Sequence, residues 1–136
     1  MKAIEAAYIA GLIDGEGSIC LTKCHSNTRR SPTVSFPNTS EALVQLFQTY
    51  CGGTIIRKRA YKANHNVSWT CTIRYDAALR LLTELLPYLR HPEKIRRARL
   101  LLAQYKSVTP RNGKYTDALN KARAKFEHQF FHPDKP

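Results

Sequence analysis

The stretch IAGLIDGEG, residues 9–17, decides the fold of this chain. Apolar and small side chains, Tyr8 and Gly11 among them, recur at helical spacing around it. This spacing predicts a helix over residues 4–13 with one face that can approach another helix closely. The glycines of residues 14–17 permit backbone angles that other residues resist, and they predict that the helix breaks there.

Downstream of this stretch, alternating apolar and polar residues predict two β-hairpins. The first joins strands at residues 18–24 and 33–36, and the second joins strands at residues 54–61 and 67–75. Inward-facing positions are apolar in both hairpins, and outward-facing positions are polar or basic. The sequence therefore predicts a half-buried sheet.

Helical spacing returns between and after the hairpins. Residues 38–40 offer N-cap side chains to a helix that ends at Gly52, and Asp76 can cap another helix behind the second hairpin. Two further helices are expected at residues 93–105 and 116–130. This order predicts an α+β fold in which helices cover one face of a four-stranded antiparallel sheet and leave a polar, basic face bare.

Charge supports a polyanionic partner for that bare face. The 22 Lys and Arg residues exceed the 10 Asp and Glu residues, which gives a formal net charge of +12. Nucleic acid is the leading candidate, although a solubilising surface or a ribosome-like basic protein would also carry such a surplus. Motif positions must decide between these alternatives.

Targeting and zinc signals are both weak. Acidic residues interrupt the N-terminal segment, so neither a signal-peptide core nor a membrane span is expected, and we expect a soluble, intracellular protein with no membrane partner. The 4 cysteines form no C-x-x-C pair, which makes a structural zinc site an unfavourable interpretation.

IAGLIDGEG resembles the signature motif of the LAGLIDADG homing endonucleases and differs from it by conservative changes at three positions. The resemblance covers roughly residues 4–105 and implies an αββαββα core whose antiparallel sheet forms a DNA-binding saddle. A C-terminal helical extension at about 114–131 fits the extra helices of single-motif members. We therefore expect residues 1–136 to form a single endonuclease domain.

Only one motif is present, and the family's active site lies between two motif helices. The resemblance therefore implies a homodimer that cleaves a long, pseudo-palindromic site in double-stranded DNA, as an intron-homing enzyme does. We expect Ala7, Ala10 and Gly11 at the dimer interface, since small residues allow close helix contact. The compartment implied is an organelle (chloroplast or mitochondrion) or the prokaryotic cytoplasm.

The resemblance also implies a metal site. Glu16 takes the family's metal-binding acidic position and the Gly15 carbonyl adds a ligand, while Asp14 satisfies backbone donors at a helix end. Hard oxygen ligands suit Mg²⁺ or another divalent cation such as Mn²⁺. Asn38 and Lys94 are expected to join Glu16 as catalytic residues, although Asn38 is also a good helix cap and Lys94 could be an ordinary surface lysine.

Strand alternation selects the residues expected to read DNA bases from the bare face. Arginines there can bond guanine edges, and Ser, Thr and Cys make adaptable contacts. The expected DNA-binding residues are Thr22, Cys24, Arg29, Arg30, Ser31, Thr33, Ser35, Arg57, Arg59, Tyr61, Ser68, Thr70 and Thr72.

Two alternatives to an endonuclease stay open at this point. A non-cleaving DNA-binding regulator can use the same scaffold, but such proteins typically lose the acidic motif residue that Glu16 retains. An RNA-binding maturase that recognises intron RNA would also use basic helices. Preference for duplex DNA or structured RNA separates these functions.

Overall fold

A computed structural model describes residues 1–59 and 66–133 of the chain. Its elements run in the order α1 (Ala3–Glu16), β1 (Ser18–Thr22), β2 (Ser31–Asn38), α2 (Glu41–Cys51), β3 (Thr54–Lys58), β4 (Ser68–Arg74), α3 (Tyr75–Leu85), η1 (Leu86–Tyr88), α4 (Pro92–Gln104), η2 (Lys106–Val108) and α5 (Asp117–Phe131).

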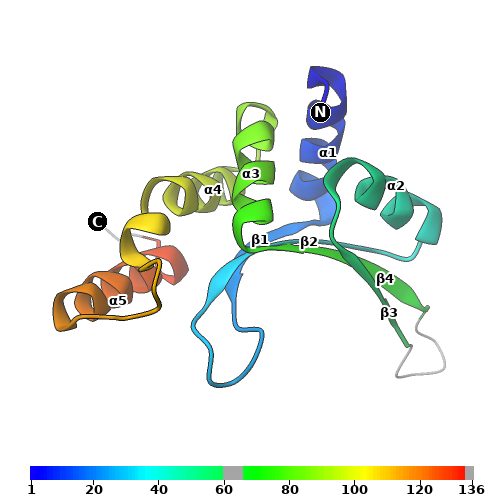
Figure 1. Cartoon of the computed structure of the whole chain (residues 1–136). Coiled ribbons are helices and arrows are strands. Elements are labelled where there is room, and N and C mark those ends of the chain that lie inside the picture. Colours follow the sequence, from blue (N-terminus) through cyan, green and yellow to red (C-terminus); the bar gives the residue numbers. More distant parts are fainter. Residues whose placement is uncertain (60–65, 134–136) are drawn as a thin grey trace.

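The strands form one antiparallel sheet in the order β1-β2-β4-β3. Helices α1, α2 and α3 stand on one side of it, and no described helix lies against its underside (Figure 1). Helices α4 and α5 lie beside the β1–β2 end of the sheet (Figure 1). The α+β fold with one covered and one bare sheet face is therefore confirmed.

The core lies between the covered face and the helices. Ile9 and Ile13 of α1 are fully buried, as are Val34 and Phe36 of β2. Phe36 stacks on Phe47 of α2 with ring centroids 4.9 Å apart. Aromatic stacking of this kind adds to the burial of apolar area, and it fixes α2 over the sheet.

The motif helix is longer than the sequence predicts. Helix α1 continues through Asp14 and Gly15 to Glu16, and the chain turns only at Gly17. A Cβ on Gly17 would lie 2.4 Å from Ile13 Cδ1 and 2.8 Å from Ile13 Cα, so this glycine is required by close packing. The expected break at residues 14–17 is thus wrong for residues 14–16, because a helix tolerates Gly15 at modest cost.

Helix α3 also begins differently from the prediction. Its cap position is Arg74, and Asp76 lies inside the first turn instead of capping it. Tyr75 adopts a φ of 57°, which is the left-handed region that non-glycine residues rarely occupy. By contrast, Ser40 caps α2 and accepts a hydrogen bond from the Leu43 amide at 3.3 Å, which agrees with the prediction.

Candidate functional site

Glu16 lies at the exposed end of α1, where the chain passes through Gly17 into β1. The side-chain amide of Asn38, at the end of β2, donates a hydrogen bond to Glu16 Oε2. Asn38 Oδ1 also accepts from the Ser40 amide at 2.8 Å, which fixes the orientation of the side-chain amide. The structure thus brings together Glu16 and Asn38, which the family resemblance groups as catalytic residues.

Asp14 and Lys94 connect the end of α1, next to Glu16, to the start of α4. Asp14 Oδ2 accepts from the Arg90 amide at 2.9 Å, and Asp14 Oδ1 accepts from the His91 amide at 3.1 Å. Lys94 Nζ donates to the carbonyls of Ile13 at 2.6 Å and Asp14 at 2.9 Å. The end of α1 and the start of α4 therefore satisfy each other's backbone groups, which helices leave without intrahelical partners at their termini.

Electrostatics favour this junction. The partial negative charge at the C-terminus of α1 meets the Lys94 ammonium, and the partial positive charge at the N-terminus of α4 meets the Asp14 carboxylate. Burial lowers the pKa of Lys94 below its ordinary value of 10.5, and the nearby Asp14 carboxylate partly offsets that effect. The junction holds Glu16 at a fixed point of the fold.

The bare sheet face is defined by strand register. Residues directly opposite each other in antiparallel strands share a face. Cys20 pairs with Thr33, and Thr33 in turn pairs with Arg74 of β4, while Lys58 pairs with Ser68. The side chains on this open face are those of Ser18, Cys20, Thr22, Ser31, Thr33, Ser35, Pro37, Thr54, Ile56, Lys58, Ser68, Thr70, Thr72 and Arg74.

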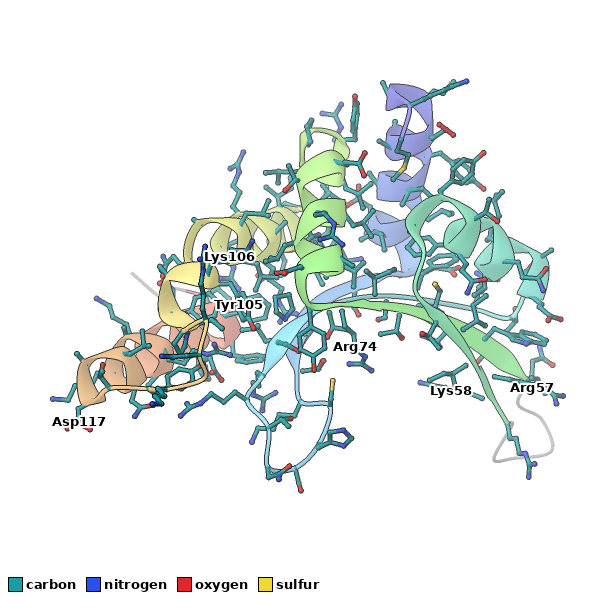
Figure 2. The ribbon with its side chains drawn as sticks, in the orientation of Figure 1. Arg57, Lys58, Arg74, Tyr105, Lys106 and Asp117 are labelled. Carbon is teal, nitrogen blue, oxygen red and sulfur yellow. The ribbon has the colours of Figure 1, made fainter. Side chains whose placement is uncertain are left out.

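One expected base-reading residue lies on the wrong face. Arg57 lies opposite Trp69, which faces the covered side of the sheet, so Arg57 has the same orientation. The adjacent Lys58 lies on the open face instead. Figure 2 shows Lys58 and Arg74 below the sheet ribbon, on its open side. Arg59 is exposed just after β3, and Tyr61 lies outside the described residues.

Two pairs of hydroxyl groups on the open face are hydrogen-bonded across β1 and β2, at one edge of the sheet. Ser18 and Ser35 share a hydrogen bond of 2.6 Å, the hydroxyls of Thr22 and Thr33 are also bonded, and Arg74 Nη1 donates to Thr22 Oγ1 at 3.4 Å. Expected DNA-binding residues that remain half-buried on this face are Thr22, Ser35, Ser68 and Thr72.

Three expected DNA-binding residues are less accessible than alternation predicts. Ser31, Thr33 and Thr70 expose only 3%, 6% and 9% of their surface. Thr70, for example, is flanked across the strands by the larger side chains of Pro37 and Ile56. Facing the open side of a sheet is therefore not sufficient for exposure when neighbouring side chains are longer.

The β1–β2 loop carries further expected contacts. Cys24 is half-buried, with Sγ 3.1 Å from the Tyr75 hydroxyl in hydrogen-bonding geometry. Arg29 is exposed and stacks on the Tyr115 ring, with Cζ 3.6 Å from the centroid. Arg30 points to α5, where its Nε lies 3.7 Å from Glu127 Oε1, so its side chain is engaged within the chain.

Helix α1 has a second apolar face. One face packs in the core, and the other displays Ile4, Ala7, Tyr8 and Gly11 to solvent, with Ile4 78% and Tyr8 48% exposed. A helix that is apolar all round normally has neighbours on all sides. Ala10 is a correction to the expected interface, since its side chain is fully buried in the core of its own chain.

The donor set at the end of α1 fits a hard cation. The Glu16 carboxylate is exposed, and a Cβ placed on Gly15 would meet no atom within 4 Å, so the backbone there is open to approach. Within residues 1–59 and 66–133, no three His, Cys, Asp or Glu side chains cluster as a metal site. Oxygen ligands beyond those of one chain would be needed to complete six-fold coordination.

Residues that sequence reasoning missed lie in the same region. Arg74 belongs to the open face, and counting every second residue from Ser68 would have found it. Arg97 Nη1 donates to the Ile19 carbonyl at 2.9 Å, which ties α4 to β1. No sequence signal indicates that second contact, because a basic helix is usually read as a solvated surface.

Among the described residues, none of the helices has the length and apolar character needed to cross a bilayer. Neither a protein-family model nor a curated protein matches the sequence.

Solved structures match the fold over nearly the whole chain. The homing endonuclease I-CvuI, in complex with its target in the presence of Ca, gives a TM-score of 0.74 at 19% identity, over 98% of this chain and 85% of that chain. The archaeal intron-encoded homing endonuclease I-Vdi141I, complexed with DNA, gives 0.63 at 14% identity over 97% and 85%. The homing endonuclease I-TnaI gives 0.56 at 12% identity over 98% and 90%. The resemblance of the IAGLIDGEG motif is thus matched by the architecture, and the chain has the fold of the LAGLIDADG homing endonucleases.

Proposed function

We propose that the protein is a site-specific endonuclease of the intron-homing type, which hydrolyses both strands of duplex DNA as a homodimer with a divalent metal ion. The observation that carries the proposal is the position of Glu16. Its carboxylate stands at the exposed end of the motif helix, is held by Asn38, and lies two residues before Ser18, the first open-face residue of β1.

The exposed apolar face of α1 supports the homodimer. Ala7 and Gly11 are small enough for a second α1 to approach closely, and Ile4 and Tyr8 offer apolar area that water would otherwise cover. Pairing two identical helices across a two-fold axis brings their C-terminal ends together. Each chain would then contribute one Glu16 to a shared site.

Two facing carboxylates repel each other unless cations lie between them. Glu16 and the Gly15 carbonyl would hold Mg²⁺ or Mn²⁺, which supplies Lewis-acid activation of the phosphodiester and of the attacking water. Asn38 occupies one acceptor site of the Glu16 carboxylate, and an ionised carboxylate offers about four. The remaining acceptor sites can serve a cation and an ordered water.

Lys94 takes a supporting role in this proposal. Two of its three N–H groups bond to the carbonyls at the end of α1, so the side chain fixes the helix turn that carries Glu16. Its positive charge also offsets the accumulation of negative charge where the helix end, the carboxylate and a DNA phosphate meet.

The open sheet face is the proposed DNA-reading surface. Arg74 and Lys58 supply cationic donors, and the paired hydroxyls of β1 and β2 can exchange their mutual hydrogen bonds for bonds to base edges or bridging water. I-CvuI and I-Vdi141I, which share this fold, are bound to DNA. The net charge of +12 favours the same kind of partner.

Incubation of a randomised duplex-DNA library with the protein and Mg²⁺, followed by sequencing of the ends, tests the proposal. We expect cuts in both strands at related sites with approximate two-fold symmetry. The matched variant Glu16→Gln keeps the Asn38 bond acceptor but lacks the negative charge, and we expect it to bind the same sites without cutting. Sequence-selective binding without cutting by the wild type would favour a DNA-binding regulator, and selection of structured RNA over DNA would favour a maturase.

A further inference from the structure

The β1–β2 loop, residues 23–30, is attached to α5 at the point where it enters β2. The Arg29 guanidinium donates from Nη2 to Asn120 Oδ1 at 3.0 Å while it stacks on Tyr115. The Arg30 guanidinium faces the Phe131 ring, with Cζ 5.0 Å from the centroid. Two consecutive loop residues are therefore held by one helix that lies about ninety residues further along the chain.

Arg123 is the centre of this attachment. It is only 2% exposed and is the charged residue among the largest fully buried side chains. Its Nη2 donates to the backbone carbonyl of Arg30, its Nη1 to Thr109 Oγ1 at 2.8 Å, and its Nε to Glu127 Oε2 at 2.8 Å. Burying a guanidinium costs free energy unless its N–H donors are hydrogen-bonded. In Arg123 one of these donors bonds to the backbone of the loop.

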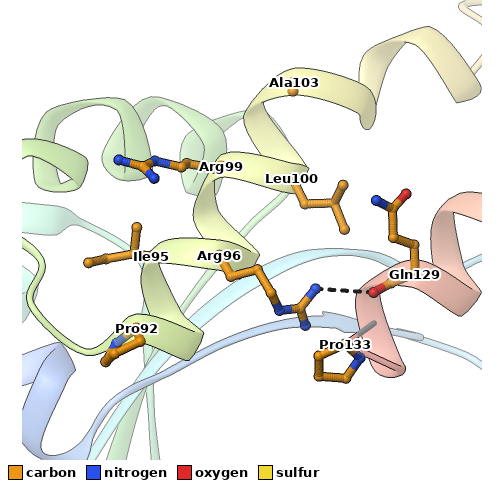
Figure 3. Close-up of a pocket in the computed structure, with 8 residues that line it drawn as sticks. All are labelled: Pro92, Ile95, Arg96, Arg99, Leu100, Ala103, Gln129 and Pro133. Carbon is orange, nitrogen blue, oxygen red and sulfur yellow. Dashed lines mark hydrogen bonds between the residues drawn. The ribbon is translucent and has the colours of Figure 1, made fainter. Parts of the chain in front are cut away.

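The other end of α5 is fixed to α4. Arg96 donates from Nη1 to the Gln129 carbonyl at 3.1 Å, as Figure 3 shows, and from Nη2 to the Phe130 carbonyl at 2.6 Å. These carbonyls belong to the last turn of α5, which has no intrahelical donors for them. Helix α4 is itself bonded to β1 through Arg97, so α5 is linked to the sheet through α4.

The tip of the loop has few such restraints. Its local bonds join His25 and Thr28, whose backbone and hydroxyl groups form a small turn. Lys23, His25, Ser26 and Asn27 are exposed there. A basic and polar loop that enters a DNA groove loses less conformational entropy on binding if the residues where it joins the sheet are already fixed.

We propose that α5 positions the β1–β2 loop for contact with duplex DNA and that Arg123 is the central positioning residue. The inference rests on the proposed function for its DNA ligand, and it goes beyond that function by assigning a role to a helix far from Glu16. In this role Arg123 touches no DNA. It lowers the ordering cost of the loop, and the Arg29 side chain is presented from a fixed position.

Comparison of Arg123→Met with Lys125→Met tests the proposal. Each substitution removes one positive charge from α5, but the Lys125 side chain is exposed and makes no hydrogen bond or ion pair to the described residues. We expect Arg123→Met to raise the Kd for target DNA about tenfold over Lys125→Met, because several side chains lose their fixed positions. Turnover at saturating DNA should be the same in both variants, since the end of α1 is unaffected.

Hydrogen exchange of residues 23–31 without DNA gives an independent readout. It should accelerate in Arg123→Met and remain at the wild-type rate in Lys125→Met. Asn120→Ala removes only the Arg29 bond, leaves the buried guanidinium in place, and should raise the Kd by about threefold. It serves as the second variant if Arg123→Met unfolds α5.

Equal Kd values for the Met variants, or for Asn120→Ala and the wild type, would overturn the proposal. Faster loop exchange without weaker DNA binding would overturn it as well. A wild-type protein that binds no duplex DNA would instead refute the proposed function, and the inference with it.

Discussion

Replacement of Asp14 by Asn tests whether the junction between α1 and α4 has the strength that its contacts imply. Asp14 accepts two backbone bonds at the start of α4, at 2.9 Å and 3.1 Å. Asn keeps one acceptor but turns an NH₂ group toward the second amide, and it also removes the charge that faces the α4 N-terminus. Loss of one helix-terminal bond and its charge costs about 1–2 kcal/mol when solvent can partly replace it.

In a chain of 136 residues this loss should lower the Tm by about 4–8 °C, measured by thermal denaturation at fixed protein concentration. Asp117→Asn is the matched control, since Asp117 also lies in the first turn of a helix while Thr116 supplies the cap bond. That change should cost only about 0.5 kcal/mol. A Tm loss for Asp14→Asn no larger than that of the control would refute the reasoning.

Further predictions concern the α4 terminus and the motif glycines. The Arg96 hydrogen bond holds the pKa of Glu93 below its ordinary value of 4.5. Wild type should therefore be more stable than Glu93→Gln at neutral pH, and this difference should disappear as the pH falls through the lowered pKa, in a pH series of thermal unfolding. A stability difference that persists in acid would contradict this prediction. Gly17→Ala should destabilise the protein by about 3 kcal/mol in urea denaturation, because its Cβ would overlap Ile13, and an unchanged midpoint would contradict that. Gly11→Ala meets no atom within 4 Å in its own chain, so it should fold normally yet weaken self-association in sedimentation; unaltered association would show that α1 does not form the interface.

Much of the fold follows from the sequence because its signals are local. Alternation in residues 33–36 and helical spacing after Ser40 are set by neighbours in the chain. The structure confirms the strand, which runs further than predicted, over Ser31–Asn38, and it confirms the helix. The wrong face predicted for Arg57 in β3 has a physical cause. Ile55 and Ile56 are both apolar, so alternation fits either face, and the pairing with β4 decides the register.

The site was predictable to the extent that the motif names it. IAGLIDGEG identifies Glu16, but the approach of Asn38 and the capping of the α1 end by Lys94 depend on tertiary packing. The attachment of Arg30 to Arg123 joins residues 93 positions apart, and no periodicity in the chain reports such a contact. Alternation also overstates the exposure of short side chains such as Thr33.

The central claim is that two chains share one active site with a Glu16 from each. Wild-type and Glu16→Gln chains, unfolded and refolded together in varied ratios at constant total concentration, test it by the rate of double-strand cleavage of a target duplex. A shared site predicts that the rate follows the square of the wild-type fraction, so an equal mixture retains about a quarter of the activity. A rate proportional to the wild-type fraction, or undiminished cutting by the variant alone, would contradict the account.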